Sequence, residues 1–181
     1  MITVGTQAWH GLGTVIPEHC SPAEALTHCG LDWDVEEATL TAITDGGSGA
    51  VRHHDVPKHK ALIHPSGAVL GVVGAEYRVF QNRELAQLVG DVAGEGAKIE
   101  TAGSLRGGRR IWFLLGGSEY SVAGVDPVHE YALFANGHDG GMAIRVLPTT
   151  VRVVCANTMT AAGAEKTGKS AQGLSIHHTK N

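Results

Sequence analysis

The chain has 181 residues, of which 43% are hydrophobic, so it is long enough to bury the core of one globular domain. Its net charge of -4 does not by itself favour binding to a polyanion, and no apolar run approaches the roughly 18 residues that a membrane-spanning helix needs. The sequence also lacks a signal peptide and any CxxC pair, so we expect a cytoplasmic protein with reduced cysteines, no membrane segment and no zinc ribbon.

The charge is divided unevenly along the chain. Residues 1–51 contain seven of the 18 carboxylates and no lysine or arginine, whereas residues 52–181 contain all 14 cationic side chains and the other 11 carboxylates. We therefore predict a single domain, residues 1–181, with an acidic N-terminal arm (1–51) and a basic β-rich remainder (52–181). This asymmetry is typical of a basic binding face or of an acidic segment that contacts a neighbouring subunit. Uneven solvation of the surface is the alternative.

The first predicted element is a short helix over residues 22–29. Ser21 and Glu24 have the spacing of a capping box, and Pro22 suits the first helical position. Partial alternation of β-branched residues then predicts a strand over residues 33–43.

A hairpin and a second helix are predicted next. The turn residues 65–67 separate two strand-like runs, which indicates a β-hairpin. Asn82 then fits the N-cap of a helix whose apolar residues recur at helical spacing as far as Gly94.

A second hairpin is centred on Arg106-Gly107-Gly108. Strand-like runs lie on both sides of this tripeptide, and Gly-Gly is a favoured two-residue turn. The arginines therefore lie at the tip and base of the hairpin. Because side chains alternate along a strand, we expect Arg109 and Arg110 to face opposite sides.

The rest of the chain is predicted to be mostly extended. Asn157 fits the cap of a short helix, and the other predicted elements are strands over residues 127–136, 141–157 with an interruption at Pro148, and 174–179. Strands thus outnumber helices and are joined mostly by short turns. The fold class predicted is α+β, with a mainly antiparallel β-sheet and two or three short helices.

Six motifs occur in order along the chain: Trp9 to Thr14, Leu31 to Val35, Tyr77 with Val79, Gln81 and Asn82, Ile99 to Leu105 with Gly107 to Arg109, Asn136 to Gly140, and Val153 to Thr158. Together they resemble the phage/plasmid-like family, also called domain of unknown function 932, from Trp9 to Asn181. The resemblance implies an origin in a phage, prophage or plasmid of a bacterial host. It also implies a more helical tail after His178, Thr179 and Asn181, and further residues before Trp9, which we expect this chain to lack.

The arginines are the leading candidates for a binding site. Glycine next to arginine permits close approach of a phosphate, and a guanidinium can bind phosphate oxygens in a bidentate manner. The predicted nucleic-acid contacts are Arg106, Arg109, Arg110, Arg145, Arg152, His138 and Asn157. Arg145 and Arg152 lie on the predicted strand over residues 141–157, and we expect them to extend the hairpin arginines into one basic strip. The alternative for Arg109 and Arg110 is that they only keep an apolar strand soluble.

His138 and Asp139 lie in a glycine-rich loop and leave three alternatives open. They can form a turn, contact nucleic acid, or act as metal ligands or an acid/base pair. The other histidines show no metal-binding spacing, and no glycine-rich nucleotide motif occurs, so we predict no metal and no cofactor.

These features support three hypotheses about function. The first is a single-stranded DNA-binding module of phage or plasmid recombination that acts as a homo-oligomer, by analogy with annealing proteins of phages. The second is a structural or assembly oligomer of a mobile element without nucleic-acid binding. The third is a metal-dependent hydrolase that uses His138 and Asp139. The first two favour a protein that is not an enzyme.

Overall fold

The computed structural model describes residues 1–5, 14–16, 20–47, 49–94, 98–122, 126–164 and 173–179. The first sequence motif, apart from Thr14, lies outside these residues. The described part of the chain forms a seven-stranded sheet, a three-stranded sheet and three helices. Almost all strand pairs are antiparallel, which confirms the α+β prediction. None of the described helices has the length and apolar character needed to cross a membrane.

The elements follow one another in this order: β1 (Ile2–Val4), β2 (Thr14–Ile16), α1 (Pro22–His28), β3 (Glu36–Asp45), β4 (Val51–Ile63), β5 (Val69–Gly74), α2 (Asn82–Ala93), β6 (Ile99–Leu105), β7 (Arg110–Val122), β8 (Asp126–Gly137), β9 (Ile144–Thr149), α3 (Ala156–Ala164) and β10 (Leu174–Ile176).

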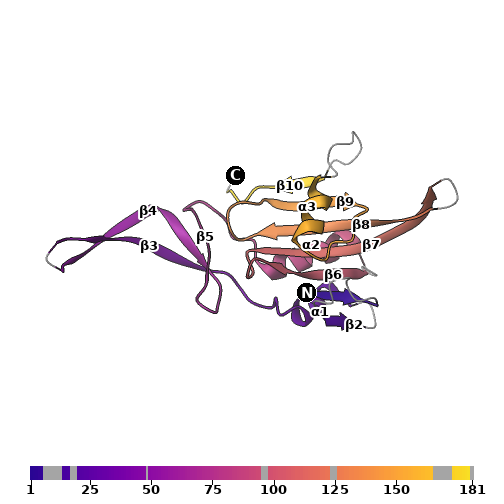
Figure 1. Cartoon of the computed structure of the whole chain (residues 1–181), viewed down its shortest axis with the longest axis horizontal. Coiled ribbons are helices and arrows are strands. Elements are labelled where there is room, and N and C mark those ends of the chain that lie inside the picture. The colour runs from indigo at the N-terminus through magenta and orange to yellow at the C-terminus, as the bar shows by residue number, and fades with distance from the viewer. Residues whose placement is uncertain are drawn as a thin grey trace.

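The larger sheet has the strand order β10-β9-β8-β7-β6-β1-β2, and the smaller one has the order β3-β4-β5. Only β1 and β2 pair in parallel among the described strands. The β7–β8 hairpin reaches beyond one end of the larger sheet, and the β3–β4 hairpin projects from the opposite end of the molecule (Figure 1). The molecule is therefore elongated, with its helices over the middle.

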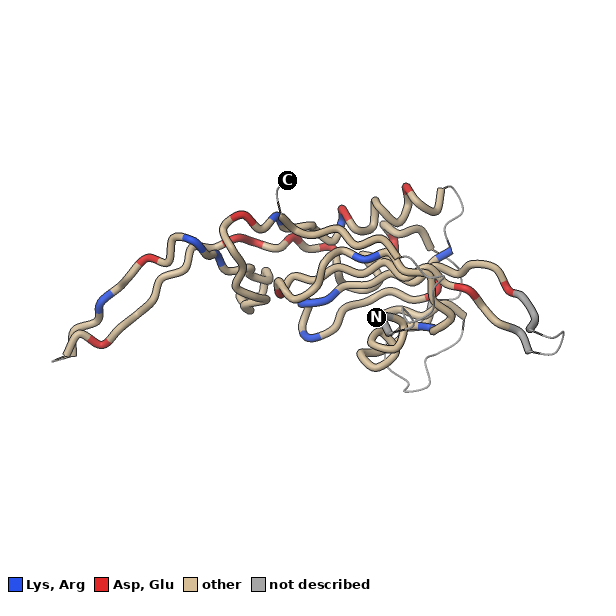
Figure 2. The backbone as a smooth tube through the Cα atoms, turned by 90° about the horizontal axis from the view of Figure 1, so that it is seen from above, with Lys and Arg blue, Asp and Glu red and all other residues tan. Residues whose placement is uncertain are grey.

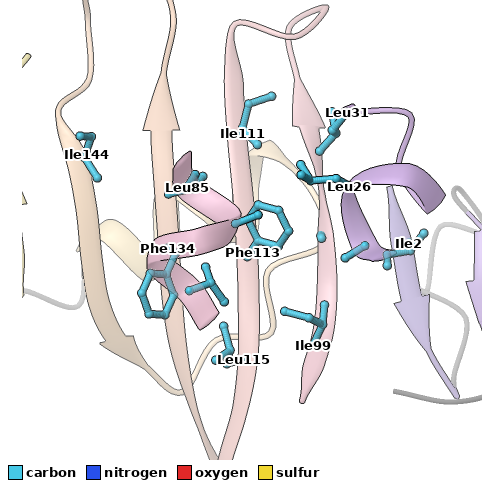
Figure 3. Close-up of a cluster of buried hydrophobic side chains, with 14 residues drawn as sticks. Ile2, Leu26, Leu31, Leu85, Ile99, Ile111, Phe113, Leu115, Phe134 and Ile144 are labelled. Carbon is cyan, nitrogen blue, oxygen red and sulfur yellow. The ribbon is translucent and has the colours of Figure 1, made fainter. Parts of the chain in front are cut away.

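Alternation along β7 separates two cores. Ile111 and Phe113 pack in the cluster that α1 and α2 cover, together with Phe134 and Leu85 (Figure 3). Trp112 and its neighbours on the other face pack with α3. Because successive side chains of a strand point to opposite faces, the apolar run of β7 supplies both cores at once.

The two predicted N-caps have different outcomes. The capping box of α1 is confirmed: the Glu24 N–H donates to Ser21 Oγ at 3.2 Å, and the Ser21 N–H donates to Glu24 Oε2 at 2.8 Å. The N-cap of α2 is Gln81, so the prediction of Asn82 is wrong by one position. Asn82 is fully buried, and its amide is used by tertiary contacts instead.

The projecting hairpin consists of β3 and β4, so it contains more of the chain than the single strand predicted over residues 33–43. It also carries cationic as well as acidic side chains. β5 pairs with β4 only at residues 59–63, so residues 41–45 and 51–55 pair with each other and with no third strand among those the structure describes. We call these two segments the distal hairpin. Figure 2 shows both lysine or arginine and aspartate or glutamate along the projection. Within the acidic N-terminal arm, β3 pairs with the cationic β4.

Candidate nucleic-acid interface

The turn between β6 and β7 presents the first of the predicted arginines. Leu105 pairs with Arg110, so the loop contains the four residues 106–109, and the predicted two-residue turn is wrong. Arg106, Gly107 and Gly108 all have positive φ, at 55°, 67° and 89°. A run of left-handed residues explains the Gly-Gly pair, since glycine adopts this conformation without steric cost.

Gly108 has a second reason to be glycine. A Cβ at this position would lie 3.0 Å from the Trp33 ring, which packs over the turn. The indole in turn lies 4.3 Å from the His64 ring, centroid to centroid. The close packing of Trp33 on Gly108 therefore holds the loop of residues 106–109, which includes Arg106, in place.

Three of the predicted arginines meet in one pocket. Arg106, Arg110 and Arg145 line a pocket of about 350 Å³ beside the first residues of α3. Arg110 begins β7 and shares its face with Trp112, while Arg145 pairs across β8–β9 with Ala135. Trp112 and Ala135 both belong to the core under α3, so strand alternation brings the two guanidinium groups to the same side.

The electrostatics of this arginine pocket are incompletely balanced. Arg110 Nε lies 3.5 Å from Asp139 Oδ2, which is the carboxylate paired with the cluster in the described structure. The Nε atoms of Arg110 and Arg145 are buried and have no hydrogen-bond partner. Three guanidinium groups and one carboxylate leave two formal positive charges, and buried donors without acceptors favour an incoming anion.

Arg109 and Arg152 lie outside the arginine pocket. Arg109 Nη2 donates to the Val69 carbonyl at 3.2 Å and so ties the turn to β5. Arg152 Nη2 lies 3.9 Å from Glu100 Oε2 and lines a different pocket of about 230 Å³. The predicted strip along the last long segment is therefore divided, because the strand ends at Thr149, before Arg152. Arg110, and not Arg109, shares the pocket with Arg106.

Asn157 was predicted to cap a helix, and both Asn157 and His138 were predicted to contact nucleic acid; the structure places them differently. Asn157 is an exposed residue inside α3, and the start of this helix is held by Thr158, whose hydroxyl accepts the Cys155 N–H at 2.9 Å. His138 has 0% of its surface exposed. The His138 side chain is therefore enclosed by the fold and does not lie on the surface with the arginines.

His138 is part of a buried polar network. Asn82 Nδ2 donates to the carbonyls of Leu31 and Trp33, which leaves its Oδ1 to accept from His138 Nε2 at 2.9 Å. The imidazole is thus neutral, with its proton on Nε2 and an unpartnered Nδ1. Burial lowers the pKa of His138 to about 4, repulsion from His178 adds to this, and Asp139 opposes it.

Residues of several sequence motifs meet around this network. Gln81 pairs with both the N–H and the carbonyl of Val35, and Asn136 Nδ2 donates to the Phe80 carbonyl at 2.7 Å. The Tyr77 ring stacks on His178 with centroids 4.5 Å apart. These contacts join the segment before α2 to β8 and to Val35, which directly precedes β3, and they join the residues after β5 to His178. The motifs therefore build the connection between the two sheets.

A metal-dependent reaction gains no support from side-chain grouping in the described residues. No three of their His, Cys, Asp and Glu side chains come together in a way that could hold a metal ion.

The apolar lining of the arginine pocket was not predicted. Leu133, Met142, Leu147 and Met159 contribute to its lining together with the arginines. These residues come from β8, β9, α3 and the loop before β9, and each has the apolar character of an ordinary core position. No local signal distinguishes them, because only the packing of α3 over the sheet places them beside Arg145.

One comparison with known proteins gives a match. A family model described as "Domain of unknown function (DUF932)" matches residues 69–181, which contain all three arginines of the pocket. Searches of the curated proteins and of the solved structures find no match to the chain.

Proposed function

The chain belongs to the DUF932 family, and we propose that it is a single-stranded DNA-binding module of a phage or plasmid, of the annealing type used in recombination, that acts as a homo-oligomer. The observation that carries this proposal is the meeting of Arg106, Arg110 and Arg145 in one pocket. Guanidinium groups bind phosphate oxygens strongly, and phosphate contacts supply most of the affinity of proteins for single strands.

A single strand suits the shape of the site better than a duplex does. The arginines lie in a recess between the 106–109 turn and α3, and do not form a flat ridge. A single strand can bend a nucleotide into such a recess, whereas the phosphates of a duplex stay on a stiff outer surface. The first turn of α3 adds backbone N–H groups without intrahelical partners and a partial positive charge.

The test is the affinity for a fluorescently labelled oligonucleotide at low salt, measured by anisotropy. The double variant Arg106→Gln/Arg145→Gln is expected to bind at least about tenfold more weakly, because each lost charge-assisted hydrogen bond costs about 1.5–3 kcal/mol. The control Arg78→Gln/Arg83→Gln removes the same charge from exposed ion pairs beside α2. Equal weakening in both variants, or no binding by the unaltered protein, would contradict the proposal.

Oligomerisation is proposed to use the distal hairpin. Isolated two-stranded hairpins are only marginally stable in water, and this one pairs with no third strand of the described chain. Ile43 and Val51 are 66% and 60% exposed and lie on the same face, since their partners are His53 and Asp45. A second copy of the chain that covers this face would bury both side chains. The same feature favours an assembly protein as the second candidate function.

Ile43→Asp/Val51→Asp is therefore expected to convert an oligomer into a monomer, measured by size-exclusion chromatography with light scattering. Val92→Asp is the control, because Val92 is also 60% exposed but lies on α2. A monomeric unaltered protein would contradict the oligomer. An oligomer that binds no oligonucleotide would favour the assembly function over DNA binding.

A further inference from the structure

The arginine pocket has a composition that a site for a continuous DNA backbone does not need. Its lining combines the three arginines Arg106, Arg110 and Arg145 with apolar side chains that include Leu133 and Met159. The two remaining arginines of the predicted strip are bound elsewhere, to Val69 and Glu100. Of the arginines in the predicted strip, only Arg106, Arg110 and Arg145 therefore share this pocket.

The charge of the pocket matches a phosphomonoester better than a phosphodiester. Three guanidinium groups and Asp139 leave two formal positive charges. A backbone phosphodiester carries one negative charge, whereas a terminal phosphate carries about 1.5 to 2 at neutral pH. The buried Nε atoms of Arg110 and Arg145 make no hydrogen bond, although Arg110 Nε has an ionic contact with Asp139 at 3.5 Å, and a terminal phosphate offers three oxygens as acceptors.

The apolar lining of the pocket provides room for a base. Its volume of about 350 Å³ falls in the range of roughly 300–1,000 Å³ that small-molecule sites occupy. Met142 and Met159 have flexible thioether side chains, which adapt to ring faces and make favourable contacts with aromatic rings. A nucleotide can therefore place its phosphate against the arginines and its base against the methionines.

We propose that the arginine pocket binds a nucleotide with a terminal phosphate, and that its ligand is the phosphorylated end of a single DNA strand. The inference rests on the proposed function, because it takes single-stranded DNA as the source of the nucleotide. A free nucleoside monophosphate has the same chemistry, so the experiment must distinguish the two sources. Recognition of a strand end would position the protein where two strands begin to be joined or annealed.

The experiment compares three versions of one short oligothymidylate, labelled on an internal base: with a 5′-phosphate, with a 3′-phosphate, and with hydroxyl groups at both ends. Thymidine monophosphate is the unlabelled competitor, and thymidine is its control. The unaltered protein is expected to bind one phosphorylated version at least about tenfold more tightly than the hydroxyl version. Arg106→Gln and Arg106→Gln/Arg145→Gln should abolish this preference, whereas Arg78→Gln/Arg83→Gln should keep it.

The single variant Arg106→Gln is included because it is expected to fold. Arg106 is exposed in the turn, and Gln has the same steric cost as Arg in its positive-φ conformation. Equal binding of all three oligonucleotides overturns the strand-end inference and leaves the single-stranded DNA proposal standing. Displacement by thymidine monophosphate with no preference for a phosphorylated end also overturns it, since the ligand would then be a free nucleotide. Failure of every probe to bind overturns both proposals.

Discussion

Asn82→Ala is expected to lower the free energy of unfolding by about 4 kcal/mol, because it leaves two polar groups without their hydrogen-bond partner. These are the His138 Nε2–H and the Trp33 carbonyl, whereas the Leu31 carbonyl, which Asn82 also contacts, keeps the Trp33 N–H as a donor at 2.8 Å. Each unsatisfied group costs about 1–3 kcal/mol, and the removed side chain leaves a small cavity besides. Urea denaturation followed by circular dichroism measures the change as a lower midpoint at an unchanged slope.

Asn157→Ala is the matched control for this measurement. Asn157 is exposed on α3, so its removal should change the free energy of unfolding by less than about 0.5 kcal/mol. If the Asn82 and Asn157 variants were equally stable, the buried network would not hold the two sheets together as described.

Acidification is expected to weaken the fold through His138. Its folded pKa of about 4 lies below the ordinary value of 6.5, so between these values the unfolded chain binds more protons than the native one. The stabilisation is therefore fully present above about pH 6.5 and is lost as the pH falls towards 4. The difference between these two pKa values corresponds to about 3 kcal/mol. Burial lowers the pKa of His178 as well, which adds to the loss in the same direction.

Two measurements isolate the contribution of His138. The unfolding free energies of the unaltered protein and of His138→Gln, taken from pH 7 to pH 4, should converge as the pH falls. The imidazole resonances of the unaltered protein, followed by nuclear magnetic resonance, should show one histidine with a midpoint near 4. A His138 midpoint near its ordinary value would contradict the buried neutral imidazole.

Local sequence signals predicted the elements whose ends depend on nearby residues. The α1 capping box is complete within Ser21 to Glu24, so no distant contact is needed to start that helix. The start of α2 was misplaced because Asn82 has the chemistry of a cap but serves distant carbonyls. Strand β1 was missed because it has only three residues and is held by pairing with β2 and β6.

The candidate site was only partly predictable, because some of its residues are brought together by contacts between segments that are distant in the sequence. The pattern around Arg106 and Arg110 is local, and both arginines do line the pocket. Arg145 reaches it only because β9 pairs with β8 in a register that puts Ala135 opposite. Arg152 was wrongly joined to that strip, since the sequence after Pro148 looks extended but leaves the sheet at Thr149. His138 was misjudged because its partner, Asn82, lies 56 residues away along the chain.

The dependence of oligonucleotide affinity on salt tests the role of the arginine pocket most directly. For single strands, the logarithm of the binding constant falls with the logarithm of salt concentration by about 0.7 for each phosphate contact. Arg106→Gln/Arg145→Gln removes two of the three arginines proposed to hold one phosphate and is therefore expected to reduce the slope by about 0.7, while Arg78→Gln/Arg83→Gln leaves it unchanged. An identical slope for the unaltered protein and the Arg106/Arg145 variant would show that these arginines do not hold phosphate.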